Sequence, residues 1–153
     1  MNEIITNKLY LGDMFDANDD LQLKANNITC VICVAERVKI NNPNIKIYKY
    51  ELVDDYNCDI INYFDEICKI INKEGIVLVN CVAGVSRSAS IIIAYLMKYY
   101  NKYLEDAFLY VREKRPRICP NKHFMKCLLD YELTLFGKNS LTNDKCIKLF
   151  YYT

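Results

Sequence analysis

An apolar run, a short glycine-containing loop and a second apolar run follow one another in the middle of the chain. This succession limits the fold more than any other feature. Residues 75–79 predict a buried strand, and residues 88–100 predict a helix that is apolar on nearly all sides, as in the middle of a domain. A loop between a strand and a helix directs backbone N–H groups and the positive end of the helix dipole to one point. The sequence therefore predicts an anion site at residues 80–87.

Three residues of this loop suit an anion. Cys81 is expected to ionise readily, because the loop amides and the nearby Arg87 stabilise a thiolate. Arg87 carries a planar guanidinium that can hold two phosphate oxygens at once. Gly84 allows a tight turn and a close approach of the backbone to an oxyanion. The loop thus combines a nucleophile with a phosphate cradle.

The stretch Cys-Val-Ala-Gly-Val-Ser-Arg-Ser, residues 81–88, resembles the phosphate loop of cysteine-dependent protein tyrosine phosphatases, in particular the dual-specificity branch. The resemblance implies hydrolysis of phosphotyrosine and of phosphoserine or phosphothreonine in proteins through a phosphocysteine intermediate, with no metal or cofactor. It makes Cys81 the nucleophile and Ser88 the residue that hydrogen-bonds its sulfur. The phosphate would be bound by the residues between them, which are Val82, Ala83, Gly84, Val85, Ser86 and Arg87.

Two adjacent aspartates lie in the polar loop after the predicted strand of residues 45–53. In the family, the general acid is an aspartate five residues before the next helix, and counting back from Asp59 gives this role to Asp54. Asp55 is the alternative, since the register of a loop slips easily. Taken alone, both aspartates would be interpreted as capping or solubilising charges.

Two asparagines complete the expected site. Asn80 stands where the family usually has a histidine that orders the loop and lowers the thiol pKa, so we expect a less acidic thiol with activity retained. Asn121 ends the phrase Arg-Pro-x-x-x-Pro-Asn, which resembles the family segment whose asparagine braces the phosphate loop. The same segment is basic. It is interpreted either as solvated charge around a turn or as a docking surface for acidic segments near a phosphosite, formed by Lys114, Arg115, Arg117 and Lys122.

Two other functional classes are weighed against an enzyme of this kind. A phosphoprotein-binding pseudophosphatase is the alternative, and Asn80 is the one feature in its favour. A redox or zinc site at Cys30 and Cys33 is rejected, because both lie in a predicted strand, residues 28–35, where residues three apart point to opposite faces. No second cysteine pair at ligand spacing follows, and the chain has one histidine.

Strands that alternate with helices predict an α/β fold with a central, mostly parallel sheet of about five strands and helices on both faces. The expected strands are residues 8–13, 28–35, 45–53 and 75–79, and the expected helices are residues 19–25, 59–74, 88–100, 104–114 and 122–136. We assign residues 1–140 to the catalytic domain. Residues 141–153 are a tail that either docks on it or leads to a further segment.

Length and charge limit the remaining possibilities. A chain of 153 residues, 52% hydrophobic, fits one domain, and a net charge of +1 favours neither nucleic acid nor a membrane as a partner. The first residues resemble no signal sequence, so the eight cysteines are expected to be reduced and the protein cytoplasmic, with the nucleus also possible. The expected partners are phosphorylated proteins, and the oligomeric state is left open.

Overall fold

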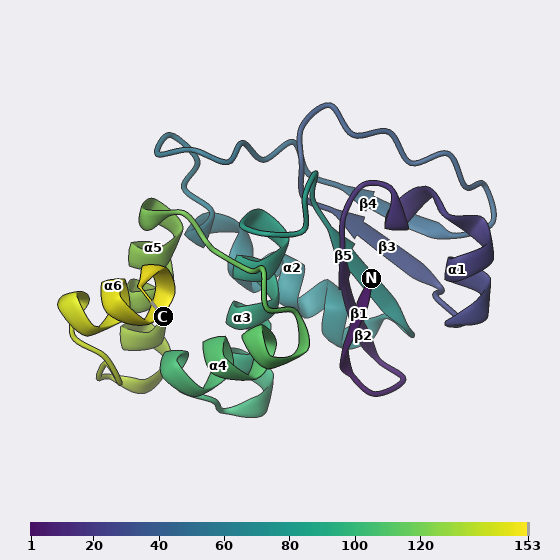
Figure 1. Ribbon diagram of the computed structural model, residues 1–153. Helices are drawn as coiled ribbons and strands as arrows, with labels where there is room; N and C mark the ends of the chain where they lie inside the picture. Colours follow the sequence, from purple (N-terminus) through teal and green to yellow (C-terminus); the bar gives the residue numbers. More distant parts are fainter. Residues whose placement is uncertain (153) are drawn as a thin grey trace.

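The computed structural model describes residues 1–152 and is built on one five-stranded sheet with the order β1-β2-β5-β3-β4 (Figure 1). β1 runs antiparallel to β2, and the other three pairs are parallel, which confirms the predicted mostly parallel sheet. The strands are β1 (Asn2–Ile5), β2 (Leu9–Gly12), β3 (Cys30–Cys33), β4 (Lys46–Lys49) and β5 (Val77–Asn80).

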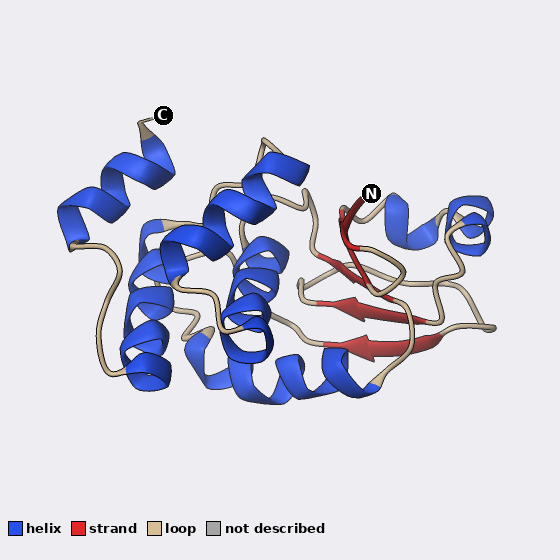
Figure 2. Cartoon of the chain, turned by 90° about the horizontal axis from the view of Figure 1, so that it is seen from below, coloured by secondary structure: helices blue, strands red, loops and turns tan. Residues whose placement is uncertain are grey.

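Helices cover both faces of the sheet, unequally. The short helices η1 (Asp16–Asn18) and α1 (Asp20–Ala25) cover one face, and most of the others gather on the opposite side (Figure 2). Side chains alternate along β2, β3 and β5, so that Tyr10, Val31 and Leu78 pack in the smaller core under α1. The larger core holds buried strand residues such as Leu9, Leu11, Ile32, Val77 and Val79. It also holds apolar side chains of α2 (Ile61–Lys73), α3 (Arg87–Tyr100), α4 (Leu104–Lys114), α5 (Lys122–Phe136) and α6 (Asn143–Tyr151).

The centre of the fold is the connection from β5 to α3. β5 lies between β2 and β3, and its last residue, Asn80, is in register with Gly12 on one side and Cys33 on the other. α3 lies among α2, α4 and α5 (Figure 1), and every side chain from Arg87 to Met97 is buried. The loop between β5 and α3 therefore starts at the carboxyl edge of a parallel sheet, where α/β proteins bind their ligands.

Several predicted boundaries agree with the structure because local capping sets them. Asp19 caps α1 by accepting a hydrogen bond from the Gln22 amide, and Gly137 ends α5 with a φ of 73°. The predicted strands are too long, since β3 and β4 span four residues each. β1 was not predicted. Its four residues show no clear alternation, and its position depends on pairing with β2 after a turn in which Asn7 adopts a φ of 54°.

Residues 141–152 of the predicted tail contain α6, which was also not predicted. Cys146 and Phe150 are buried, and the Phe150 ring stacks on Phe108 with the two centroids 3.9 Å apart. The Tyr151 hydroxyl donates to the Pro120 carbonyl at 2.8 Å. The tail therefore packs on the helical side of the domain. The division into residues 1–140 and 141–153 stays a prediction, and Thr153 lies outside the described residues.

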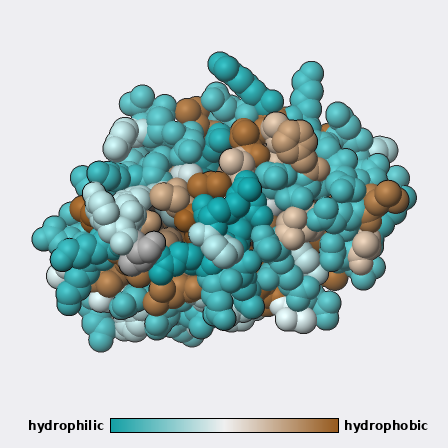
Figure 3. Space-filling view, in the orientation of Figure 1, coloured by the Kyte–Doolittle hydropathy of each residue, from teal (hydrophilic) through white to brown (hydrophobic). Residues whose placement is uncertain are grey.

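The surface in the orientation of Figure 1 is mainly hydrophilic, with hydrophobic residues in small groups (Figure 3). Within residues 1–152, no helix combines the length and the apolar character that a membrane span requires.

Candidate active site

The loop after β5 holds its carbonyl groups outward. Each carbonyl from Cys81 to Ser86 accepts a hydrogen bond, and the donors are Asn80, Met14, Arg115, Arg117, Cys119 and Ser90. In a planar trans peptide the N–H points away from the C=O, so carbonyls that are bonded on the outside turn the amides inward. Successive inward amides at the N-terminus of α3 form a concave site for an anion.

Cys81 lies at the mouth of this loop with 2% of its surface exposed. Its Sγ is 3.2 Å from the Ser88 Oγ and accepts a hydrogen bond from the Gly84 amide at 3.3 Å. Burial acts to raise the pKa of this thiol. The hydrogen bonds from the Ser88 hydroxyl and from backbone amides, together with the Arg87 charge, outweigh burial and hold the pKa below its ordinary value of 9.0.

Arg87, the first residue of α3, is buried, and its Nε is a buried donor without a partner among the described residues. Its Nη1 donates to the Leu52 carbonyl at 2.9 Å, which fixes the guanidinium against the segment that leads into the acidic loop. A buried, charged donor without an acceptor is costly. The side chain is therefore suited to an anion that supplies the missing oxygen.

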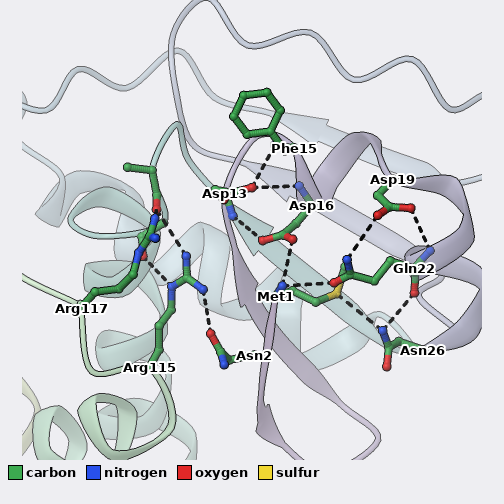
Figure 4. A network of polar contacts seen from close by, with 12 residues as sticks. Met1, Asn2, Asp13, Phe15, Asp16, Asp19, Gln22, Asn26, Arg115 and Arg117 are labelled. Carbon is green, nitrogen blue, oxygen red and sulfur yellow. Dashed lines mark hydrogen bonds and ion pairs between the residues drawn. The ribbon is translucent and has the colours of Figure 1, made fainter.

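Arg115 holds the outer side of the loop, a role that the sequence did not predict. Its Nε donates to the Gly84 carbonyl at 2.8 Å, its Nη2 to the Ala83 carbonyl at 3.3 Å and its Nη1 to Asn2 Oδ1 at 2.7 Å (Figure 4). Arg117 also donates to the Ala83 carbonyl. The buried Arg115 is thus not a solvated charge. The structure divides the predicted basic cluster, because its two arginines donate hydrogen bonds to carbonyls of the phosphate loop.

Gly84 makes this packing possible. Its φ is 65°, and a Cβ at this position would lie 2.5 Å from Arg115 Nη2 and 2.6 Å from the Gly12 carbonyl oxygen. The close approach of β2 and Arg115 to the loop therefore requires glycine.

Asn80 is fully buried beneath the loop. Its Nδ2 donates to the Cys81 carbonyl at 3.1 Å and lies 3.7 Å from the Cys33 Sγ. Asn80 thus orders the first carbonyl of the loop. The family's usual histidine at this position also orders the loop, and that role needs no titratable charge.

Asn121 connects the acidic loop with the anion-binding loop. Its backbone amide donates to the Ser86 Oγ at 2.9 Å, and its side-chain Nδ2 donates to Asp54 Oδ1 at 2.8 Å. The resemblance implied that the side chain braces the phosphate loop, whereas in the structure the backbone contacts the loop and the side chain holds the carboxylate. Asp55 is turned to a local contact, since its Oδ1 accepts from the Asn57 amide at 2.8 Å.

The remaining cysteines differ from Cys81 in their environment. Cys30 and Cys33 lie at opposite ends of β3, and burial raises the pKa of Cys30 to about 12 and also raises that of Cys33. Thiols of this kind are inert core residues. In the described part of the chain, no three histidine, cysteine, aspartate or glutamate side chains are grouped as metal ligands.

Comparisons with known proteins agree with this geometry. Residues 9–134 match a family model described as the catalytic domain of dual specificity phosphatases. The chain is 43% identical to dual specificity protein phosphatase 14 of Mus musculus over 90% of this chain and 72% of that protein. It is 40% identical to dual specificity protein phosphatase 18 of Homo sapiens, over 90% and 76% of the two chains. The crystal structure of human DUSP28 superposes with a TM-score of 0.84 at 27% identity, covering 90% of this chain and 99% of that one.

Proposed function

Because this chain belongs to the dual-specificity protein phosphatases, and so is a cysteine-dependent hydrolase of phosphotyrosine and phosphoserine or phosphothreonine in proteins, we propose that Cys81 is its nucleophile and Arg87 its phosphate clamp. The unpaired Nε of the buried Arg87, beside a thiol of lowered pKa, is the observation that carries this assignment. Such a donor binds an equatorial phosphate oxygen as charge develops there.

In the first step, the Cys81 thiolate attacks phosphorus and forms a sulfur–phosphorus bond while the bond to the departing oxygen breaks. The amides of Val82, Ala83, Gly84, Val85, Ser86 and Arg87 face the three equatorial oxygens. Asp54 gives its proton to the departing oxygen, which leaves as the free hydroxyl of the substrate.

In the second step, water attacks the phosphocysteine. Asp54, now a carboxylate, takes a proton from the water, and the sulfur leaves as a thiolate. The Ser88 hydroxyl, 3.2 Å from the sulfur, stabilises this leaving thiolate by a hydrogen bond. The cycle ends when inorganic phosphate departs.

Asn121 is the positioning residue for Asp54. The carboxylate is exposed, and the hydrogen bond from Asn121 Nδ2 fixes it relative to Ser86 of the phosphate loop. This contact supports Asp54 over Asp55 as the general acid. Asn121 thus contacts both the general acid, Asp54, and Ser86 of the phosphate loop.

The reaction needs a reduced thiol, which supports a reducing compartment, the cytoplasm or the nucleus, as the location of the protein. A pseudophosphatase would need neither the nucleophile nor the acid, and no comparison favours it.

The assignment is tested with an aryl phosphate and a phosphoserine peptide as substrates. Wild-type protein should release phosphate from both, and Cys81→Ser and Arg87→Lys should each release almost none. The Lys variant keeps the charge but loses the planar fork. Turnover by the Cys81→Ser variant at the wild-type rate would exclude the proposed nucleophile.

A further inference from the structure

A basic pocket lies beside the acidic loop, where α5 meets α6, and the catalytic roles above leave it unused. It has a cavity volume of about 280 Å³. Residues from three separate segments line it, and these are Tyr56, Lys122, His123, Met125, Lys126, Asn143 and Ile147.

Positive charge dominates this pocket. Lys122 and Lys126 are four residues apart on α5, so they lie next to each other on one face of the helix. No ion pair of either lysine is present among the described residues, no acidic side chain lies in the first turn of α5, and no carboxylate lines the cavity. His123, in contrast, contacts an acidic residue, with its Nε2 3.0 Å from Asp59 Oδ1.

The pocket is close to the reacting groups. Lys122 follows Asn121, which contacts both Asp54 and Ser86, and Tyr56 is two residues beyond Asp54. Since an extended peptide advances about 3.3–3.6 Å per residue, side chains a few positions from the phosphorylated residue are the ones to test against this neighbouring pocket.

Another cavity that borders the acidic loop carries charge of the other sign. Glu51, Asp55 and Asp59 line this cavity of about 320 Å³. An anionic side chain of the substrate is repelled from that cavity and attracted to Lys122 and Lys126. The electrostatics therefore favour an anionic side chain in the lysine-lined pocket over one in the acidic cavity.

We propose that the pocket around Lys122 and Lys126 is a subsite for an anionic side chain near the phosphorylated residue of the substrate, either a carboxylate or a second phosphate. This inference rests on the proposed function, because it concerns the same substrates. It adds a sequence preference, for substrates that are acidic or phosphorylated on one side of the cleaved phosphate.

The test compares phosphotyrosine peptides that differ at one position, two to four residues before or after the phosphotyrosine. That position carries glutamine, glutamate or a non-hydrolysable phosphonate analogue of phosphoserine. For each enzyme, the ratio of kcat/KM between an anionic peptide and its glutamine counterpart is measured, so that any general change in activity cancels. The ratio should be about three- to tenfold on one side only and should fall at high salt, since exposed ion pairs are individually weak and screened.

Lys122→Met with Lys126→Met removes both charges and keeps the side-chain length and helix propensity. This double variant should lower the ratio to about one, and the double change to Glu should bring it below one. Lys24→Met is the matched control, because Lys24 is an exposed lysine on α1, across the sheet. The control should keep the wild-type ratio.

Three outcomes are distinguishable. If the wild type hydrolyses all peptides with a ratio near one, or the Met double variant keeps the wild-type ratio, the subsite is refuted and the proposed function stands. If the wild type hydrolyses none, the proposed function is refuted. In that case, the affinities of the same peptides for the Cys81→Ser protein, measured by fluorescence anisotropy, decide the subsite independently.

Discussion

Replacement of Ser88 by alanine isolates the hydrogen bond that lowers the pKa of the nucleophile. The Ser88 hydroxyl lies 3.2 Å from the Cys81 sulfur, and this contact is the largest of those that oppose the effect of burial on the thiol. Without it the pKa of Cys81 should rise. The Gly84 amide and the Arg87 charge remain, so the rise is limited.

The size of the shift follows from the strength of one hydrogen bond to a charged group, about 1.5–3 kcal/mol, which corresponds to roughly 1–2 pH units. The thiolate is the reactive form and exists above the pKa. The acidic limb of kcat/KM should therefore move to higher pH by about 1–2 units in Ser88→Ala. Below the limb, the variant should be about ten- to a hundredfold slower than the wild type.

The rate at which iodoacetamide alkylates Cys81, measured against pH, gives the thiol pKa without any substrate. Ser90→Ala is the matched control, because Ser90 is equally buried in α3 but its hydroxyl donates to the Ser86 carbonyl at 2.7 Å. The reasoning is refuted if the alkylation profile of Ser88→Ala coincides with that of the wild type, or if Ser90→Ala shifts it as far.

Four further changes test other contacts. Asp54→Ala should slow a phosphoserine peptide by about 10²–10⁴ and a nitrophenyl phosphate far less, because the alkyl oxygen needs the proton. Asn121→Ala should cost about tenfold on the same peptide, and nothing further in the Asp54→Ala background; an additive loss would remove Asn121 from its positioning role. Arg115→Lys should lower kcat by about ten- to a hundredfold with little loss of folding, since lysine cannot bond two carbonyls and Asn2 together; wild-type kcat would show that the loop holds its shape alone. Glu132→Gln should lower the free energy of unfolding by about 1–3 kcal/mol in urea titrations, because the buried carboxylate accepts from the Leu104 amide at 2.6 Å and the Ser140 hydroxyl at 2.6 Å; an unchanged midpoint would contradict this.

The sequence predicted those features that local chemistry determines. The apolar runs around Cys81 placed the central strand and the buried α3, and the spacing of Cys81, Gly84 and Arg87 indicated an anion site before any contact was known. The limits of α5, Lys122–Phe136, followed from an asparagine cap and a terminal glycine.

Features that depend on distant partners were not predicted. Arg115 lies 31 residues from the Gly84 carbonyl that it bonds, and nothing near Arg115 in the sequence distinguishes it from a solvated charge. Asn121 and Asp54 are 67 residues apart, so the side-chain contact that connects them is equally hidden. The basic cluster predicted from the sequence therefore separates into arginines that hold the phosphate loop and Lys122, which lines the pocket, whereas Lys114 lies over the Tyr110 ring.

Direct detection of the covalent intermediate tests the central assignment best. The Asp54→Ala variant, mixed with an aryl phosphate and quenched within milliseconds, should accumulate a phosphoenzyme, since it can form the intermediate but lacks the base that hydrolyses it. Mass spectrometry should then find one phosphate on the peptide that contains Cys81. Steady turnover with no phosphate on Cys81, or with phosphate on another residue, would contradict the assignment.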